Sequence, residues 1–282
     1  MKRTIVFGSV AALFLAACTE STSPLRVTAN DQDLAAVLAA SDATAEDANV
    51  LYASDLTLSG GASGSAAFLA PQLLRSPDGV QPLFSWTFGS GCSYDQAQGR
   101  FTCPSITDGG LTLTRDYAFF DASQNPQSAY DASTTASANF HIAVSGTHTV
   151  DTGVDNVDRD RSLTVSGLAG AETSRTWNGT GTRNDNGYRM DGDVKRSYAV
   201  SDNVTLSNIV VDLPRSSHPW PVSGTITRNV TGTGSISRNG VEKSFSISRT
   251  VTVTFNGTQF AAVTVGSNSY SLDLATGHVT KN

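Results

Sequence analysis

The chain has few of the residues from which catalytic and metal sites are built. It contains three cysteines and four histidines in 282 residues. The histidines are scattered, and only His141 and His148 are close enough to share one strand, whereas metal sites need ligands at close, patterned spacing. The sequence motifs of serine hydrolases, zinc proteases and phosphate-binding loops do not occur. We therefore expect no catalytic residue, no resident metal and no cofactor, and hence a protein that is not an enzyme.

Charge is also scarce. Only 16% of the residues are charged, and 19 basic residues against 25 acidic ones give a formal net charge of −6. A nucleic-acid binder would show a clustered basic footprint, so we expect no nucleic-acid partner. Glycine, serine and threonine are abundant and long apolar helices are absent, which is typical of an exported β protein.

No apolar run is long enough to cross a bilayer as a helix, which needs about 20 residues. The one apolar stretch, residues 5–17, follows the positive charges of Lys2 and Arg3. A short apolar stretch behind a basic start indicates a cleavable export signal.

This stretch ends in Leu15-Ala16-Ala17-Cys18, which resembles the lipobox of bacterial lipoproteins. The resemblance covers residues 1–18 only, and the rest of the chain resembles no characterised family. It implies cleavage before Cys18, a diacylglyceryl group on its sulfur and an acyl chain such as palmitate on its new amine. Several acyl chains make a stable membrane anchor. Thr19 is not the aspartate of inner-membrane retention, so the outer membrane is favoured in a host with two membranes. The alternative is an ordinary signal with a chance cysteine.

Four segments follow along the chain. Residues 31–52 show the only clear helical signal, with an N-cap at Asn30 or Asp31 and Leu34, Val37 and Leu38 at helical spacing. A second short helix is expected near 67–74, and strands and turns follow from about residue 80. We divide the chain into a signal peptide (1–17), a lipidated cysteine and tether (18–30), a helical and loop segment (31–76) and a β domain (77–282).

The two remaining cysteines, Cys92 and Cys103, form an even pair 11 positions apart. An even pair in an exported chain predicts a disulfide. Closing a loop of this size contributes roughly 3 kcal/mol in the chain-entropy model.

The clearest strand is 244–255, where apolar residues alternate with serine and threonine. Such alternation indicates one buried and one wet face. Asn239-Gly240, just before it, predicts a two-residue type I′ turn. That turn fixes the register, so that Arg238 faces Val241, Gly234 faces Phe245 and Gly232 faces Ile247.

A second copy of this hairpin lies earlier in the chain, because residues 175–200 match residues 228–253 after a shift of 53 positions. The match predicts a turn at Asn186-Gly187, with Arg175 near Arg196 and, in the later copy, Arg228 near Arg249. We expect a mainly β fold: an antiparallel meander of long hairpins that forms a curved sheet, an open barrel or a sandwich, with short N-terminal helical segments.

Four arginines fall on the apolar face of these hairpins: Arg175, Arg196, Arg228 and Arg249. Arginine is rarely buried without partners. Each guanidinium could pair with an inward aspartate such as Asp212 or Asp273, extend past the sheet edge, or stack on an aromatic ring, as Arg196 on Trp177. Alternatively, the arginines line a groove and bind a small anionic ligand. We expect carboxylate partners and a structural role.

Two acidic stretches raise the question of calcium. Asp151, Asp155, Asp158 and Asp160 are weak candidates, since calcium takes six to eight oxygen ligands from closely spaced carboxylates. The stretch from Asn184 to Asp193 lacks a bidentate glutamate and is better explained as a turn. Solvated loop acids are the simpler interpretation of both.

These features favour a monomeric, lipid-anchored protein of the cell envelope that binds a ligand or partner without catalysis. A structural or adhesive surface protein, with contacts made by a serine- and threonine-rich face, is the alternative. A hydrolase with an unmarked site is a second alternative. An inner cavity that contains the arginines would favour the ligand-binding protein. A filled core with a flat hydroxyl face would favour the structural or adhesive protein, and a histidine–acid pair in a cleft would favour the hydrolase.

Overall fold

The computed structural model describes residues 91–214, 217–276 and 278–282, together with eight residues between 33 and 58. The expectations for the export signal, Cys18, the tether and a helix near 67–74 fall outside the described residues. Within the described part, no helix has both the length and the apolar character needed to span a membrane.

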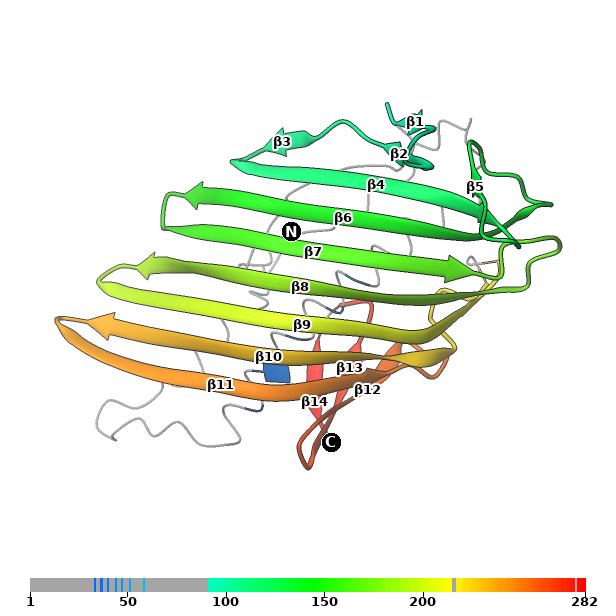
Figure 1. The fold of residues 1–282 in the computed structure, drawn as a ribbon. Helices are drawn as coiled ribbons and strands as arrows, with labels where there is room; N and C mark the ends of the chain where they lie inside the picture. The colour runs from blue at the N-terminus through cyan, green and yellow to red at the C-terminus, as the bar shows by residue number, and fades with distance from the viewer. Residues whose placement is uncertain are drawn as a thin grey trace, which may run out of the picture.

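The described chain is mainly β, as the sequence predicts, and forms one antiparallel sheet of fourteen strands (Figure 1). The strands are β1 (Ser93–Asp95), β2 (Arg100–Thr102), β3 (Ile106–Asp108), β4 (Leu111–Asp121), β5 (Pro126–Gln127), β6 (Thr135–Val150), β7 (Gly153–Ser166), β8 (Ser174–Asp191), β9 (Val194–Asp212), β10 (Ser223–Arg238), β11 (Val241–Thr254), β12 (Phe260–Val265), β13 (Asn268–Asp273) and β14 (Val279–Lys281).

The sheet is a meander, since from β6 to β14 each strand pairs with the next one in sequence. Short β3 and β5 both pair with β4 at its border. The long strands β6 to β11 form a broad, gently curved surface (Figure 1). The sheet does not close on itself, so of the three forms expected from the sequence the open curved sheet is the one observed.

The β10–β11 hairpin has the register that the sequence predicts. Arg238 pairs with Val241, Gly234 with Phe245 and Gly232 with Ile247. Both turn residues have positive φ, 52° at Asn239 and 78° at Gly240. A type I′ turn requires this conformation at its two central positions.

The second copy does not turn where the match places it. Asn186-Gly187 lies inside β8, and the chain turns six residues later, at Gly192-Asp193, so that Asp191 pairs with Val194. Gly192 has φ 60°, which suits the first central position of a type II′ turn. The prediction of a turn at Asn186-Gly187 is therefore wrong. So is the prediction that Arg175 lies near Arg196, because Arg175 pairs with Val211.

Gly187 has a different reason to be glycine. It lies opposite Asp155 of β7, and a Cβ added at Gly187 would come within 2.2 Å of the Val154 carbonyl oxygen and 2.9 Å of Asp155 Oδ1. Glycine is needed here for close approach between strands rather than for a turn.

The core lies against one face of the sheet, which we call the inner face. Trp177, Phe140 and Ile226 are almost fully buried there, and the Trp177 and Phe140 rings lie 5.8 Å apart. The eight described residues between 33 and 58 are all helical and buried, and those with apolar side chains join the same core: Ala36, Val37, Ala40, Leu51 and Leu58. The helical residues expected from the sequence thus pack on the inner face.

The predicted disulfide joins Cys92 and Cys103. It closes the β1–β2 hairpin, whose turn is held by Asp95: the backbone N–H of Ala97 donates to its carboxylate at 2.8 Å. β2 then pairs with β4, so the crosslinked hairpin caps the first edge of the sheet.

Candidate functional site

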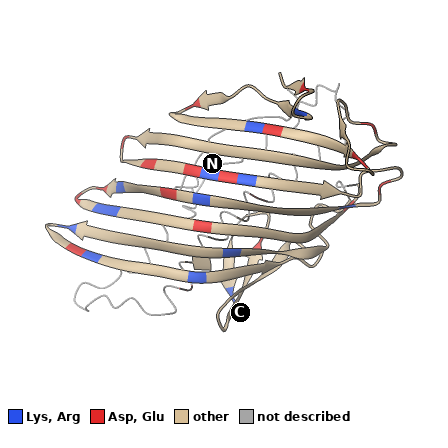
Figure 2. Cartoon of the chain, viewed as in Figure 1, with Lys and Arg blue, Asp and Glu red and all other residues tan. Residues whose placement is uncertain are grey.

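The two faces of the sheet differ sharply in chemistry, and each offers candidates for function. On the inner face charged side chains are buried among apolar ones. The outer face is exposed and consists mainly of short uncharged side chains. Figure 2 shows the charged positions most densely along β7 and β8, whereas β6 between β4 and β7 has none.

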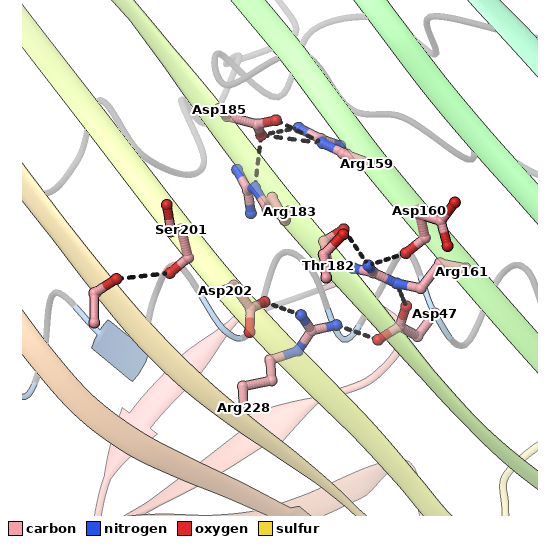
Figure 3. Close-up of polar contacts among 11 residues, drawn as sticks. Asp47, Arg159, Asp160, Arg161, Thr182, Arg183, Asp185, Ser201, Asp202 and Arg228 are labelled. Atoms are coloured by element: carbon pink, nitrogen blue, oxygen red, sulfur yellow. Dashed lines mark hydrogen bonds and ion pairs between the residues drawn. The ribbon is translucent and has the colours of Figure 1, made fainter.

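The deepest charge of the inner face is Arg228, whose side chain has no exposed surface. Its two terminal nitrogens donate to the carboxylates of Asp202 and Asp47 (Figure 3). Asp47 also accepts from Nε of Arg161 at 2.9 Å. Asp47 comes from the helical residues and both arginines from the sheet, so these ion pairs attach one to the other.

A second buried ion cluster lies beside the first. Asp185 accepts from Nη2 of Arg159 at 2.5 Å and from Nε of Arg183 at 2.6 Å (Figure 3). Burial alone would raise the pKa of this carboxyl. The charges and hydrogen bonds of the two guanidinium groups outweigh that effect and lower its pKa to about 2.

Asp155 occupies the inner face near the β8–β9 turn. It accepts from Arg189, with one contact at 2.9 Å, and from the Tyr198 hydroxyl at 2.5 Å. Burial and the negative charge of Asp155 raise the pKa of Tyr198. Tyr198 therefore stays protonated, and its hydroxyl donates a hydrogen bond to Asp155.

The four arginines predicted from the sequence all lie on the inner face and all meet a carboxylate. Arg175 donates to Glu172 at 2.5 Å, Arg196 to Asp191 at 3.2 Å, Arg228 to Asp202 and Asp47, and Arg249 to Asp33. The expectation of acidic partners is confirmed.

The particular partners suggested were wrong. Asp273 instead accepts from Gln259 at 2.8 Å, and neither it nor Asp212 meets one of the four arginines. A stack of Arg196 on Trp177 is also excluded, because Trp177 pairs with Ile209 and Arg196 with Arg189. The shifted turn is the cause of this error.

Glycines opposite the buried charges make room for them. Arg161 lies across Gly181 of the neighbouring strand, where an added Cβ would come within 2.6 Å of its Cδ and Nη1. The same atom, Nη1, donates to the Thr182 carbonyl oxygen at 2.8 Å. Gly153 makes room for Arg189 in the same way. Glycine therefore occurs at these strand positions because a long side chain of the neighbouring strand lies over the backbone there.

The calcium candidates do not come together. Residues 153–160 are strand rather than loop, and alternation sends Asp155 to the inner face and Asp158 and Asp160 to the outer face, while Asp151 lies in the β6–β7 turn. Among the described residues, no group of three or more histidine, cysteine, aspartate or glutamate side chains is placed to hold a metal ion. The interpretation of this stretch as a loop was wrong. Buried and exposed residues alternate along it as in a strand, but several of the buried residues are charged, so the alternation does not appear as an apolar pattern.

His141 lies on the outer face between two carboxylates. Its Nδ1 is 3.0 Å from Asp116 and its Nε2 is 2.7 Å from Asp160, and Asp116 also pairs with Arg100. Both ring nitrogens of His141 are thus within hydrogen-bond distance of a carboxylate.

The outer face of β8 to β11 is an ordered array of hydroxyl and amide groups. One row crosses the strands in direct register and consists of Thr180, Thr205, Thr227 and Thr252. The next row is Thr182, Asn203, Asn229 and Thr250, in which Thr250 donates to Asn229 at 2.8 Å. Within a row, residues on neighbouring strands are about 4.8 Å apart.

Near the hairpin ends of β9, β10 and β11 this array contains an open hollow of about 670 Å³. Seven of its ten lining residues point their side chains to the outer face: Ser197, Ala199, Thr233, Ser235, Glu242, Ser244 and Ser246. Tyr198, Gly234 and Phe245, which alternate with them, complete the lining. We call this feature the serine hollow. Its only charged residue is Glu242.

Four inner-face arginines of β7 and β8 were not predicted from the sequence: Arg159, Arg161, Arg183 and Arg189. A signal was present in β7, where Val157, Leu163 and Val165 continue the alternation on both sides of two arginines. Reading those arginines as inward residues of a strand would have found them. The serine hollow had no comparable signal, because it depends on how three strands align.

Searches of protein-family models, curated proteins and solved structures found no match to this chain.

Proposed function

We propose that this chain is a lipid-anchored protein of the cell envelope that binds an uncharged, polyhydroxylated ligand, such as a neutral glycan, in the serine hollow. The observation that carries the proposal is the hydroxyl-rich lining of that hollow, in which Glu242 is the one charged residue. Serine and threonine hydroxyls donate and accept hydrogen bonds, which matches a ligand whose own hydroxyls do both.

The distribution of charge supports a neutral ligand. The lining holds one carboxylate and no lysine or arginine, so it offers no partner for a phosphate or a carboxylate group. The arginines that would serve an anionic ligand are on the opposite face, where acids of the chain already engage them. An anionic ligand gripped by the inner face is therefore the weaker alternative.

Attachment to the membrane through Cys18 belongs to the same proposal. The lipobox supports it, and an anchored protein with a wide polar face suits the binding of envelope polymers. The array of serine, threonine and asparagine also agrees with an adhesive surface protein, the alternative function. The two differ in whether binding is confined to the hollow.

The experiment is an array of neutral and uronic-acid oligosaccharides probed with the purified chain, followed by titration of the strongest binders. We compare Thr233→Val with Ser246→Ala, a directly paired couple in the hollow, against Thr227→Val with Thr252→Val on the same strands and face. Two lost hydrogen bonds at about 1 kcal/mol each weaken binding roughly thirtyfold in the first variant. The control variant should bind as the wild type does.

Binding that falls equally in both variants supports the adhesive alternative, in which the whole face makes contacts. Preference for the uronic-acid probes, or no binding to any neutral oligosaccharide, would overturn the proposal.

A further inference from the structure

One row of side chains on the outer face crosses the long strands from β6 to β11 and is polar at every position but one. Each member pairs directly with the next, in the order Thr147, Asn156, Asn186, Ala199, Thr233 and Ser246. We call this set the interrupted row. Its one apolar member, Ala199, is exposed and lines the serine hollow.

Side-chain hydrogen bonds run in one direction along the first part of the interrupted row. The Thr147 hydroxyl donates to Oδ1 of Asn156 at 2.8 Å, and Nδ2 of Asn156 donates to Oδ1 of Asn186 at 2.9 Å. Because Oδ1 of Asn186 accepts from β7, its Nδ2 is directed away from β7. The residue directly opposite Asn186 on β9 is Ala199, whose side chain cannot accept a hydrogen bond. The N–H donors of Asn186 therefore lie at the border of the hollow.

The polar side chains resume on the far side of Ala199. Thr233 pairs directly with Ala199 and is exposed, and its hydroxyl can donate or accept. Asn186 and Thr233 are two strand spacings apart, about 10 Å, and both side chains reach into this gap. An amide group fits between them, because its C=O can accept from Asn186 while its N–H donates to Thr233.

Tyr188 adds an aromatic ring at the same end of the hollow. It lies directly opposite Ser197, on the same face as Asn186. Nζ of Lys195 lies over one face of the ring, 4.6 Å from its centroid, and this cation–π contact holds the ring in place. The other face of the ring gives the C–H groups of a sugar an apolar surface.

We propose, on the basis of the function proposed above, that the glycan bound in the serine hollow carries acetamido groups, and that one acetamido group completes the interrupted row above Ala199. Its amide then joins Asn186 to Thr233, and its methyl group packs on the Ala199 methyl. A sugar hydroxyl is too short to reach both polar partners, and it would leave the Ala199 methyl without an apolar contact.

The test compares two neutral probes that share one linkage and differ in one substituent. Chito-oligosaccharides carry an acetamido group where cello-oligosaccharides of equal length carry a hydroxyl. We titrate both into the full chain, purified in detergent, by isothermal calorimetry. The wild type should bind the chito-oligosaccharide roughly tenfold more tightly, since the acetamido group adds a hydrogen bond and a buried methyl.

Two variants test the residues of the gap. In Asn186→Asp the carboxylate still accepts from Asn156 but has no N–H to donate, so the preference for the chito-oligosaccharide should disappear. Ala199→Asn should also remove it, because an amide of the chain then fills the gap. The matched control, Asn184→Asp, adds the same charge to the same strand and face one row away, where Asn184 accepts from Ser201 at 2.9 Å. It should keep the preference of the wild type. All three positions are exposed, so folding is not at risk.

The outcomes separate this proposal from the function on which it rests. Equal binding of the two probes by the wild type, or an unchanged preference in Asn186→Asp, would overturn the acetamido site and leave a neutral-glycan protein. Failure of the wild type to bind either probe, or any other neutral oligosaccharide, would overturn both. A preference lost equally in the Asn184→Asp control would show that added charge is the cause, and would overturn the role of Asn186.

Discussion

Asp185 is the carboxylate that two buried arginines share, and its side chain is only 1% exposed. Removing one partner of a buried ion pair leaves an uncompensated charge, which costs about 3–5 kcal/mol. The cost arises from desolvation, so it does not require that the intact cluster be strongly stabilising.

We predict that Asp185→Asn lowers the free energy of unfolding at pH 7 by about 3–5 kcal/mol. The folded pKa of about 2 lies below the ordinary value of 3.8, so the stability from this carboxylate is present above about pH 4 and is lost as pH falls through 2. The variant should therefore lose less stability than the wild type between pH 4 and pH 2. Urea unfolding at several pH values measures this difference, and equal slopes would contradict it.

At the residue scale, the sequence predicted which face of the sheet a side chain lies on better than it predicted which residues that side chain contacts. The turn of the second hairpin was misplaced by six residues, and moving a two-residue turn along the chain shifts the register of its strands by an even number of residues. Because side chains alternate with a period of two, Arg175 and Arg196 stayed on the inner face although their neighbours changed. Their acidic partners were not predictable from strand pairing. Glu172 lies in the connection before β8 and Asp191 is the last residue of β8, so both contacts depend on the conformation of the chain near a turn.

The ion pairs of Asp47 and Asp33 join two elements that are far apart in the chain. Asp47 contacts Arg161 and Arg228, and Asp33 contacts Arg249 and accepts from Asn268 at 2.7 Å. The helical residues thus meet the sheet over β7, β10, β11 and β13.

We predict that Asp47→Asn destabilises the protein by about 3–5 kcal/mol, because Arg228 would keep only one of its two carboxylates in a fully buried site. Asp193→Asn is the control, since the Asp193 side chain is 51% exposed in its pair with Arg238 and surface pairs contribute about 0–1 kcal/mol. Thermal or urea unfolding compares the two. A loss in Asp47→Asn no larger than in the control would show that the attachment does not depend on this aspartate.

At the element scale, hairpins were predictable where turn chemistry and alternation agreed. In β10–β11 the Asn-Gly turn and a twelve-residue alternation gave one register, and the structure has it. In β8–β9 two turn signals six residues apart competed. The pairing of β8 with β7 sets Gly181 opposite Arg161 and Gly187 opposite Asp155. The sequence of the β8–β9 hairpin alone does not predict this pairing.

At the scale of the whole molecule, the proposed lipid anchor concerns where the protein lies in the cell. A short apolar segment cannot hold a protein in a bilayer, whereas several acyl chains on one residue can. Under this proposal, the attachment to the membrane depends on the single thiol of Cys18.

We predict that Cys18→Ser moves the protein from the detergent phase to the aqueous phase in detergent partitioning of whole-cell extracts. The paired change Cys92→Ser with Cys103→Ser is the control, because it removes the disulfide and leaves the lipobox intact. Partitioning of Cys18→Ser into detergent to the same degree as the wild type would exclude the anchor.

At this scale the class of fold was predictable and the binding surface only in part. Composition and alternation indicated one wet, hydroxyl-rich face, and that face exists. The serine hollow depends on how β9, β10 and β11 align beside one another. No local pattern in the sequence fixes how β9 aligns with β10.

The order of the strands has a consequence for how the chain reaches this structure. From β6 onward each strand pairs with its neighbour in sequence, so the loops that must close are short, and β proteins with local pairings fold faster than those with distant ones. The sheet can therefore grow one strand at a time from β6 onward. The contacts of Asp33 and Asp47 span far longer stretches of chain, and Asp33 cannot complete its site until Asn268 is in place. We therefore expect the helical residues to pack against the inner face last, after the strands of the sheet have paired.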